Sequence, residues 1–109
     1  MTAATDLSNA IRLALSQDGH FICRANVGKF KMADGRWFDT GLPKGFSDLF
    51  GNRAGDAVAF YIEVKAGRDR LRPEQETFLA AMRARGAIAG VARSVDDARQ
   101  LLRNSHQSV

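Results

Sequence analysis

The chain has 109 residues, of which 45% are hydrophobic and 26% charged, and its formal net charge is +4 with a pI of about 9.8. This length favours a single domain over residues 1–109, and the basic balance favours a polyanionic partner such as nucleic acid. No apolar run approaches the ~20 residues that span a bilayer and no signal peptide is recognisable, so we expect a cytoplasmic protein with no membrane association.

The periodicity of the apolar residues predicts helices and strands in alternation. Pro73 suits the first turn of a helix, and Gly86 suits its end. Ser94 and Asp97 have the spacing of a capping box at the start of a last helix. Segment 27–45 is rich in glycine and charge and suits two short strands joined by a turn. In order, the predicted elements are a helix at 6–17, strands at 20–26, 46–51 and 57–65, a helix at 73–85, a strand at 87–92 and a helix from 94 onward.

These elements predict an α/β sandwich in which helices flank one sheet. The segment AVAFYIEVK (57–65) is the strongest strand, and the following helix should return the chain to a parallel strand by a right-handed crossover. The segment AIAGVA (87–92) is wholly apolar, which is typical of a strand buried in the middle of a sheet.

Charged residues interrupt two of the predicted strands. Side chains alternate along a strand, so Glu63 and Lys65 lie on the face opposite the apolar residues of the same segment. Asp48 interrupts the strand 46–51 in the same way, and two acids on adjacent strands suggest a cation between them. The alternative is that Glu63 and Lys65 form an ion pair on an exposed edge strand and that Asp48 begins a turn.

A polar residue also interrupts the helix predicted at 73–85. Gln75 lies at the centre of its apolar stripe, where an amide costs stability unless it has partners. The strand with Glu63 leads directly into this helix, and breaks in local pattern that converge on one place indicate a functional site. Two carboxylates suit Mg²⁺ or Mn²⁺, and Lys65 can orient a water molecule or offset charge on a phosphate.

Other chemistries find no support in the sequence. Cys23 is the only cysteine, and His20 and His106 lie far apart with no metal ligand at suitable spacing. No G-x-x-x-x-G-K-[ST] phosphate loop occurs. The sequence therefore argues against an intrachain disulfide, a cysteine-bound zinc, a serine or cysteine triad and an NTPase.

Residues 41–98 resemble the virus-type replication–repair nuclease domain (VRR-NUC), a branch of the PD-(D/E)XK nuclease superfamily. The similarity comprises an aspartate, E-x-K, a basic loop, a Pro-x-Gln helix start, and an apolar strand followed by RS. It implies a restriction-endonuclease-like core with a central mixed β-sheet flanked by helices. Residue by residue, it implies metal binding by Asp48, Glu63 and the carbonyl of Val64, catalysis by Lys65, and support of the catalytic site by Gln75.

The resemblance also implies an activity. Such a domain would be a Mg²⁺- or Mn²⁺-dependent endodeoxyribonuclease that hydrolyses phosphodiester bonds in branched DNA such as four-way (Holliday) junctions. Short stand-alone members, many of them encoded by phages, form homodimers, which implies a homodimer and action in a bacterial host. The chain departs from the family pattern at Ser47, where a proline is usual, and in the first helix. In that helix, many relatives have a metal-binding glutamate, whereas this chain has Ser8 and Asn9, and Asp6 is the only nearby acid. The site could therefore bind either one metal ion or two.

Two basic segments are expected to bind DNA phosphates from the metal side of the sheet. The expected contacts are Lys29, Lys31, Arg36 and Lys44 before the Asp48 strand, and Arg68, Arg70 and Arg72 after Lys65. For any single residue, a solvated loop charge is the alternative. Trp37 and Phe38 either stack on a base at an opened junction or pack in the core or at a dimer interface. Segment 27–41 and the last helix are the candidate interface elements.

Three functions remain open. The first is the structure-selective nuclease. The second is a DNA-binding module of the same fold with weak or no activity. The intact set of acidic and basic site residues argues against this second function, whereas the missing glutamate on the first helix argues for it. The third is a restriction-type or toxin nuclease for duplex DNA, and the short chain leaves little room for the insertion that would read a sequence.

Overall fold

The computed structural model describes residues 2–104, and Met1 and residues 105–109, His106 among them, lie outside the described part. Within that part, no helix is both long enough and apolar enough to cross a membrane. The elements are α1 (Ala3–Gln17), β1 (Phe21–Arg24), β2 (Lys29–Lys31), β3 (Trp37–Asp39), β4 (Leu49–Asn52), β5 (Ala59–Val64), α2 (Pro73–Ala84), β6 (Ile88–Ala92) and α3 (Val95–Asn104).

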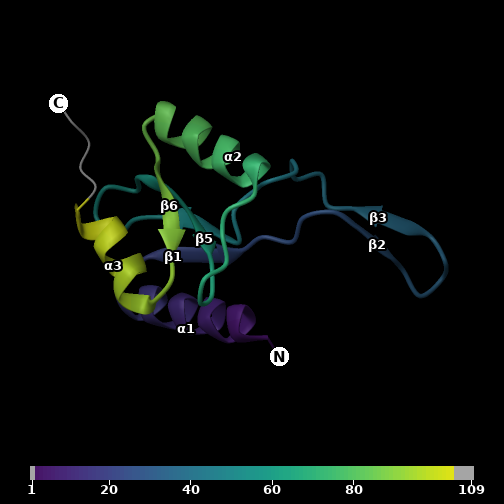
Figure 1. Cartoon of the computed structure of the whole chain (residues 1–109), viewed down its shortest axis with the longest axis horizontal. Helices are drawn as coiled ribbons and strands as arrows, with labels where there is room; N and C mark the ends of the chain where they lie inside the picture. Colours follow the sequence, from purple (N-terminus) through teal and green to yellow (C-terminus); the bar gives the residue numbers. More distant parts are fainter. Residues whose placement is uncertain (1, 105–109) are drawn as a thin grey trace.

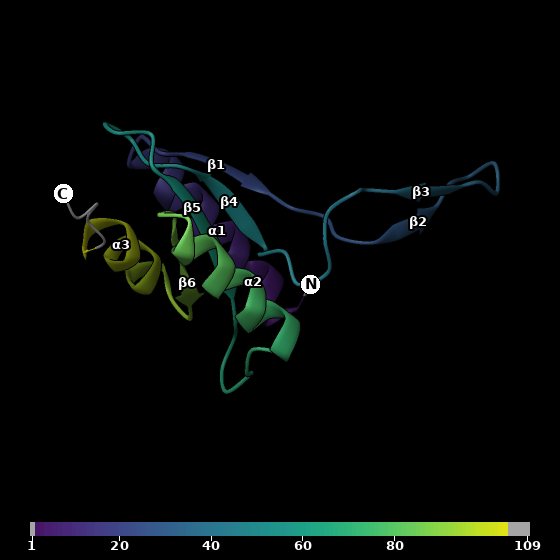
Figure 2. The same ribbon diagram turned by 90° about the horizontal axis from the view of Figure 1, so that it is seen from above.

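Four strands form one mixed sheet in the order β1-β4-β5-β6 (Figures 1 and 2). The pairs β1–β4 and β4–β5 are antiparallel, whereas β5 and β6 are parallel. Helix α2 lies on one face of the sheet, and α1 and α3 lie on the other (Figures 1 and 2). The predicted α/β sandwich and the parallel pairing of the strands on either side of α2 are confirmed.

The prediction that 87–92 forms a central strand is wrong, because β6 lies at the edge of the sheet. Ile88, Ala89 and Ala92 are nevertheless no more than 6% exposed. They are buried because α2 packs against one face of β6 and α3 against the other. A strand covered on both faces has a continuous apolar sequence wherever it lies in the sheet.

The alternation of side chains along β5 divides the interior into two layers. Ile62 and its neighbours two residues away join the core beneath α1 and α3, which includes Ile11 and Leu15. Tyr61 faces α2 and meets the ring of Phe78 edge-to-face at 5.5 Å between ring centroids. The next side chain on the α2 face is that of Glu63, so the alternation places this acid beside the first turn of α2.

Two element boundaries differ from the predicted ones. Helix α1 begins at Ala3, earlier than expected, because the Thr2 hydroxyl accepts a hydrogen bond from the backbone N–H of Thr5 at 3.1 Å. Strand β4 begins at Leu49, so Asp48 lies immediately before the strand and is only half-buried. The first acid of the candidate site therefore lies in a loop at the end of the sheet.

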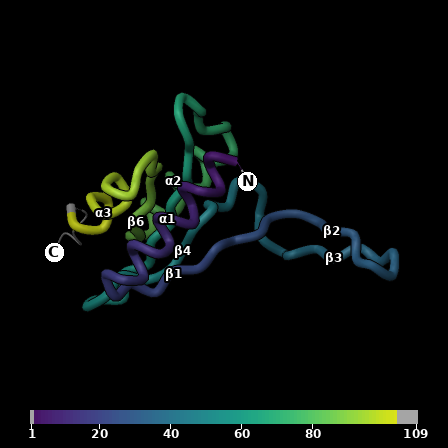
Figure 3. Tube along the Cα trace, turned by 90° about the horizontal axis from the view of Figure 1, so that it is seen from below, coloured from purple at the N-terminus to yellow at the C-terminus, as the bar shows by residue number. Residues whose placement is uncertain are grey.

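Strands β2 and β3 form a separate hairpin, which we call the arm, that projects from the end of the sheet (Figures 1 and 3). The predicted turn at 33–35 joins them. The projecting arm makes the molecule elongated, with a length of 49 Å and widths of 28 and 27 Å. Trp37 and Phe38 are 66% and 54% exposed, so the interpretation that they pack in the core is wrong.

Candidate active site

The candidate site lies where β4 begins and β5 ends, and backbone groups fix its first acid. The Asp48 side chain accepts a hydrogen bond through Oδ2 from the N–H of Val64 at 2.9 Å. The buried hydroxyl of Ser47 donates to the carbonyl oxygen of Leu49 at 2.9 Å. Because the preceding loop is held in this way without the usual proline, the Asp48 carboxylate is directed toward the end of β5.

The second acid is buried and is held by the first turn of α2. Glu63 is 2% exposed, and its Oε1 accepts a hydrogen bond from Nε2 of Gln75 at 3.2 Å. Gln75 is 5% exposed, and its Oε1 accepts the backbone N–H of Arg72 at 2.9 Å. The amide that interrupts the apolar stripe of α2 therefore links the start of the helix to the carboxylate of β5.

The other oxygen of Glu63 has no such partner. Oε2 is buried, and no group in residues 2–104 donates a hydrogen bond to it. Burial, followed by the neighbouring Asp48 carboxyl, raises the pKa of Glu63 to about 8, whereas the charges of Lys65 and Arg72 act to lower it. Two carboxylates in this arrangement either share a proton or bind a cation.

The donor atoms fit a hard divalent cation. Carboxylate and carbonyl oxygens suit Mg²⁺ or Mn²⁺, and the Glu63 carboxyl, whose Oε2 has no donor, is close enough to the Asp48 carboxyl for its pKa to be raised by it. The carbonyl of Val64, at the end of the same strand, is a candidate third oxygen. Over the described residues, no larger cluster of His, Cys, Asp or Glu side chains gathers at this site or elsewhere.

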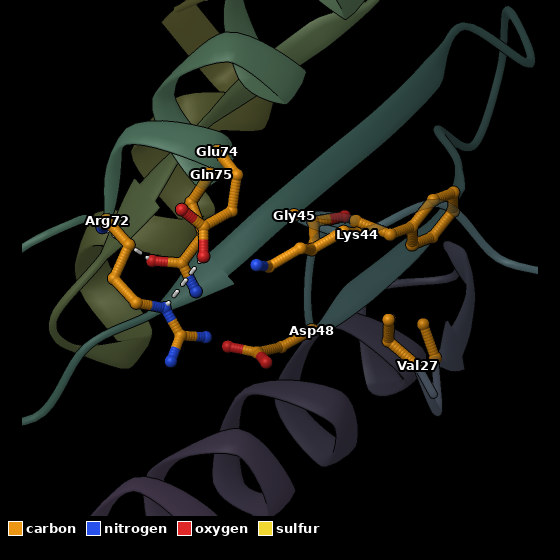
Figure 4. A pocket seen from close by; sticks show the side chains of 10 residues that line it. Val27, Lys44, Gly45, Asp48, Arg72, Glu74 and Gln75 are labelled. Carbon is orange, nitrogen blue, oxygen red and sulfur yellow. Dashed lines mark hydrogen bonds and ion pairs between the residues drawn. The ribbon is translucent and has the colours of Figure 1, made fainter. Parts of the chain in front are cut away.

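A cleft of about 470 Å³ opens beside Asp48, between the loop before β4 and the start of α2 (Figure 4). Lys44 and Arg72 line this cleft, and Arg72 lies 3.5 Å from the carboxylate of Glu74. The two walls of the cleft come closest together at Gly45, whose φ is +87°. A Cβ atom at this position would lie 2.3 Å from the carbonyl oxygen of Glu74. The loop with Lys44 can approach α2 this closely only because residue 45 is glycine.

The family comparison agrees with this geometry. The model of the VRR-NUC domain matches residues 7–96 of the chain, from within α1 to the start of α3. The chain belongs to the VRR-NUC family. No curated protein sequence matches it. The mixed sheet flanked by helices is the PD-(D/E)XK-like fold of this family, and the family places the chain among nuclease-type domains that process DNA.

The seven basic residues that are expected to bind DNA lie in three different parts of this VRR-NUC domain. Two, Lys44 and Arg72, line the cleft, and Arg68 and Arg70 lie exposed on the loop between β5 and α2. The remaining three, Lys29, Lys31 and Arg36, are on the arm, where Arg36 is paired with Asp34 at 2.7 Å. The structure therefore brings only two of the seven beside Asp48.

A smaller hollow of about 130 Å³ on the other side of Asp48 is lined by Thr5, Ser8 and Arg24. Ser8 therefore lies beside Asp48, whereas Asp6 is exposed and does not line the hollow. Sequence reasoning missed Arg24. The signal for it was the pairing of β1 with β4, because that pairing places the last residue of β1 opposite the first of β4.

Proposed function

We propose that this VRR-NUC domain, residues 1–109, is an intracellular, metal-dependent, structure-selective endodeoxyribonuclease that hydrolyses phosphodiester bonds in branched DNA such as four-way junctions. The main support is the pairing of the buried Glu63 with the half-buried Asp48, in which Oε2 of Glu63 has no hydrogen-bond donor among the described residues. A buried acid beside a second acid destabilises a protein unless a cation or proton compensates. Mg²⁺ or Mn²⁺ is the proposed cofactor.

In the proposed mechanism, Asp48, Glu63 and the carbonyl of Val64 would hold the cation, which supplies charge neutralisation at the scissile phosphate. Lys65 follows β5 directly and is half-buried, and its charge acts on Glu63. It is placed to orient the attacking water and to donate hydrogen bonds to a phosphate oxygen. Lys44 and Arg72 would bind phosphates that enter the cleft.

Gln75 is proposed as a positioning residue. Replacement of Gln75 by leucine should lower Mn²⁺ affinity about 10- to 100-fold, because Glu63 then loses the donor that orients its carboxylate. Calorimetric titration with Mn²⁺ measures the change, and Gln100→Leu, the same substitution on an exposed position of α3, is the control. Equal Mn²⁺ affinities for Gln75→Leu and the wild type would exclude this role.

Arg68 and Arg70 are proposed to bind phosphates. They are exposed and form no ion pair with a carboxylate in the described part of the chain. Replacing both by alanine should weaken DNA binding and reduce the slope of log K against log[salt] by about 1.8, since each phosphate contact contributes ~0.9. Binding is measured with Ca²⁺ in place of Mg²⁺. The control is Arg85→Ala/Arg103→Ala, which removes equal charge near the ends of α2 and α3, and an unchanged slope for Arg68 and Arg70 would refute the assignment.

We also propose that the domain acts as a homodimer, because two sites related by a two-fold axis can cut both strands of a symmetric four-way junction. The cleavage test uses end-labelled four-way junction, flap and plain duplex DNA with Mg²⁺, Mn²⁺ or EDTA. We expect cuts in branched DNA only, and none with EDTA. Cutting of plain duplex would indicate a restriction-type nuclease instead.

One observation favours a second candidate function, a DNA-binding module without useful activity. Ser8 lines the hollow beside Asp48, whereas many family members have a metal-binding glutamate on this helix. If every substrate stays intact with both metals while junction DNA still binds tightly, the binding module becomes the better account.

A further inference from the structure

The smaller cavity on the α1 side of Asp48 has no role in the proposed mechanism. We call this cavity, lined by Thr5, Ser8, Arg24 and Asp48, the Arg24 hollow. The cleft with Arg72 lies on the other side of the same acid, and Figure 4 shows Asp48 pointing toward Arg72, with the purple ribbon of α1 below it. Ala25 and Asp48 line both cavities, so the hollow and the cleft are adjacent.

The backbone fixes Arg24 beside Asp48. Arg24 is paired with Leu49 between β1 and β4, and the next N–H, that of Ala25, donates a hydrogen bond to the carbonyl oxygen of Asp48 at 2.9 Å. Ile22, two residues earlier, packs into the core beneath α1, so the alternation of the strand directs the Arg24 side chain to the same face. The fold therefore places a guanidinium at the end of the sheet, on the side of Asp48 that faces α1.

The Arg24 guanidinium is free to bind a ligand. Arg24 is exposed, and its side chain forms no hydrogen bond and no ion pair within residues 2–104, whereas Arg99, for example, pairs with Asp18 at 2.8 Å. A guanidinium is always charged, and its fork of N–H donors matches the oxygens of a phosphate. The hydroxyl of Ser8, in the wall of the same hollow, can donate a further hydrogen bond.

The same hollow is unsuited to a second divalent cation. Asp48 is the only carboxylate that lines it, and the charge of Arg24 repels a cation. Mg²⁺ and Mn²⁺ need several oxygen ligands, for which carboxylates are the usual source in proteins. An anion is therefore the better ligand for the Arg24 hollow.

We propose that the Arg24 hollow is a phosphate-binding subsite, in which Arg24 and Ser8 bind the DNA phosphate adjacent to the one that is cut. The strand runs from the cleft with Lys44 and Arg72, past Asp48, and into the hollow. An endonuclease must accept a strand that continues on both sides of the cut bond, and two adjacent basic cavities on either side of the acid meet this requirement. The inference rests on the proposed function for the identity of the ligand, and it assigns a substrate contact to that same site.

The first test measures the binding of four-way junction DNA with Ca²⁺ in place of Mg²⁺. Replacing Arg24 by alanine should weaken binding at least about 10-fold, because charge-assisted hydrogen bonds to a phosphate are lost. Arg24→Lys should restore only part of the affinity, since lysine keeps the charge but not the fork. The control is Arg12→Ala, which removes the same charge from α1 at a position outside the hollow and should bind as the wild type does. An Arg24→Ala variant that binds the junction as tightly as the wild type would overturn the proposal.

A neutral phosphate analogue locates the contact. Junctions are prepared in which one phosphate at a time near the branch point is replaced by a methylphosphonate. In the wild type, one such replacement should weaken binding by about the same factor as Arg24→Ala, and in Arg24→Ala that replacement should have no further effect, since both changes remove one contact. A merely structural role of Arg24 predicts instead that the two losses add at every position, and this result would contradict the subsite.

Titration with Mn²⁺ alone distinguishes an anion site from a cation site. We expect one ion per chain for both the wild type and Arg24→Ala. A second ion that binds more tightly once Arg24 is removed would show that the hollow binds a cation and would refute the proposal. A chain that couples Arg24 to one phosphate but cuts no DNA would leave this inference standing while the proposed nuclease failed. A chain that cuts junctions without such coupling would retain the proposed function and lose the subsite.

Discussion

Replacing Glu63 by glutamine is expected to abolish cleavage and, at the same time, to make the metal-free protein harder to unfold. The amide no longer supplies the anionic oxygen for a cation, and loss of several kcal/mol of charge stabilisation lowers the rate by about 10³-fold or more. The same change removes a 2%-exposed carboxyl whose Oε2 has no donor within residues 2–104. We expect the free energy of unfolding at pH 8 to rise by about 2–3 kcal/mol.

Cleavage of junction DNA and urea unfolding in EDTA measure the two effects. Glu76→Gln is the matched control, because it makes the same substitution on an exposed residue in the first turn of α2 and should change neither quantity appreciably. A Glu63→Gln variant that cleaves at the wild-type rate would remove Glu63 from the active site. A variant that is inactive and also less stable would indicate that Glu63 has only a structural role.

The stability of the metal-free protein should fall as the pH rises from about 4.5 to about 8. In the folded chain the pKa of Glu63 is raised from 4.5 to about 8, chiefly by burial and secondly by Asp48. Between these values the unfolded chain has released its proton while the folded chain retains it, so raising the pH favours unfolding. The contribution is fully present below pH 4.5, and its loss by pH 8 is on the order of 2–4 kcal/mol.

Urea unfolding at several pH values, with the wild type compared against Glu63→Gln, isolates this group because all other titrations are common to both proteins. The difference between the two should grow with pH in EDTA and shrink when Mg²⁺ or Mn²⁺ is added, since the cation stabilises the ionised pair. A difference that does not vary with pH would show that the folded chain does not raise the pKa of Glu63.

The sequence was informative about the fold where burial leaves a periodic pattern. The helices, the long strand β5 and its parallel partner were recognisable from apolar spacing and from signals such as Pro73 and Gly86. The edge position of β6 could not be recognised in this way, because periodicity indicates that a residue is buried but does not indicate which strand lies beside it. The early start of α1 depended on a single hydroxyl cap at Thr2.

The candidate site was visible because its residues break local rules. Asp48, Glu63 and Gln75 each place a polar group in an apolar pattern, and the structure brings all three together through hydrogen bonds or direct proximity. Arg24 followed no pattern of its own and could be found only from strand pairing. Which oxygen of Glu63 lacks a donor is a matter of three-dimensional geometry and leaves no trace in the sequence.

The two strands of the arm and their turn were predicted, but the exposure of its aromatic residues was not, and the reason is physical. Phe38 and Trp37 have the composition of core residues, yet both lie on a hairpin outside the core. A sequence pattern distinguishes apolar from polar faces, but it does not show whether the covering surface belongs to the same chain.

The most direct test of the account is calorimetric titration of Mn²⁺ into the wild type and into Asp48→Asn and Glu63→Gln, in the absence of DNA. The account predicts saturable binding of at least one ion per chain by the wild type, weakened at least 100-fold in each variant. Wild-type protein that binds no Mn²⁺, or variants that bind it as tightly as the wild type, would contradict the central claim that these two carboxylates form the metal site of a nuclease.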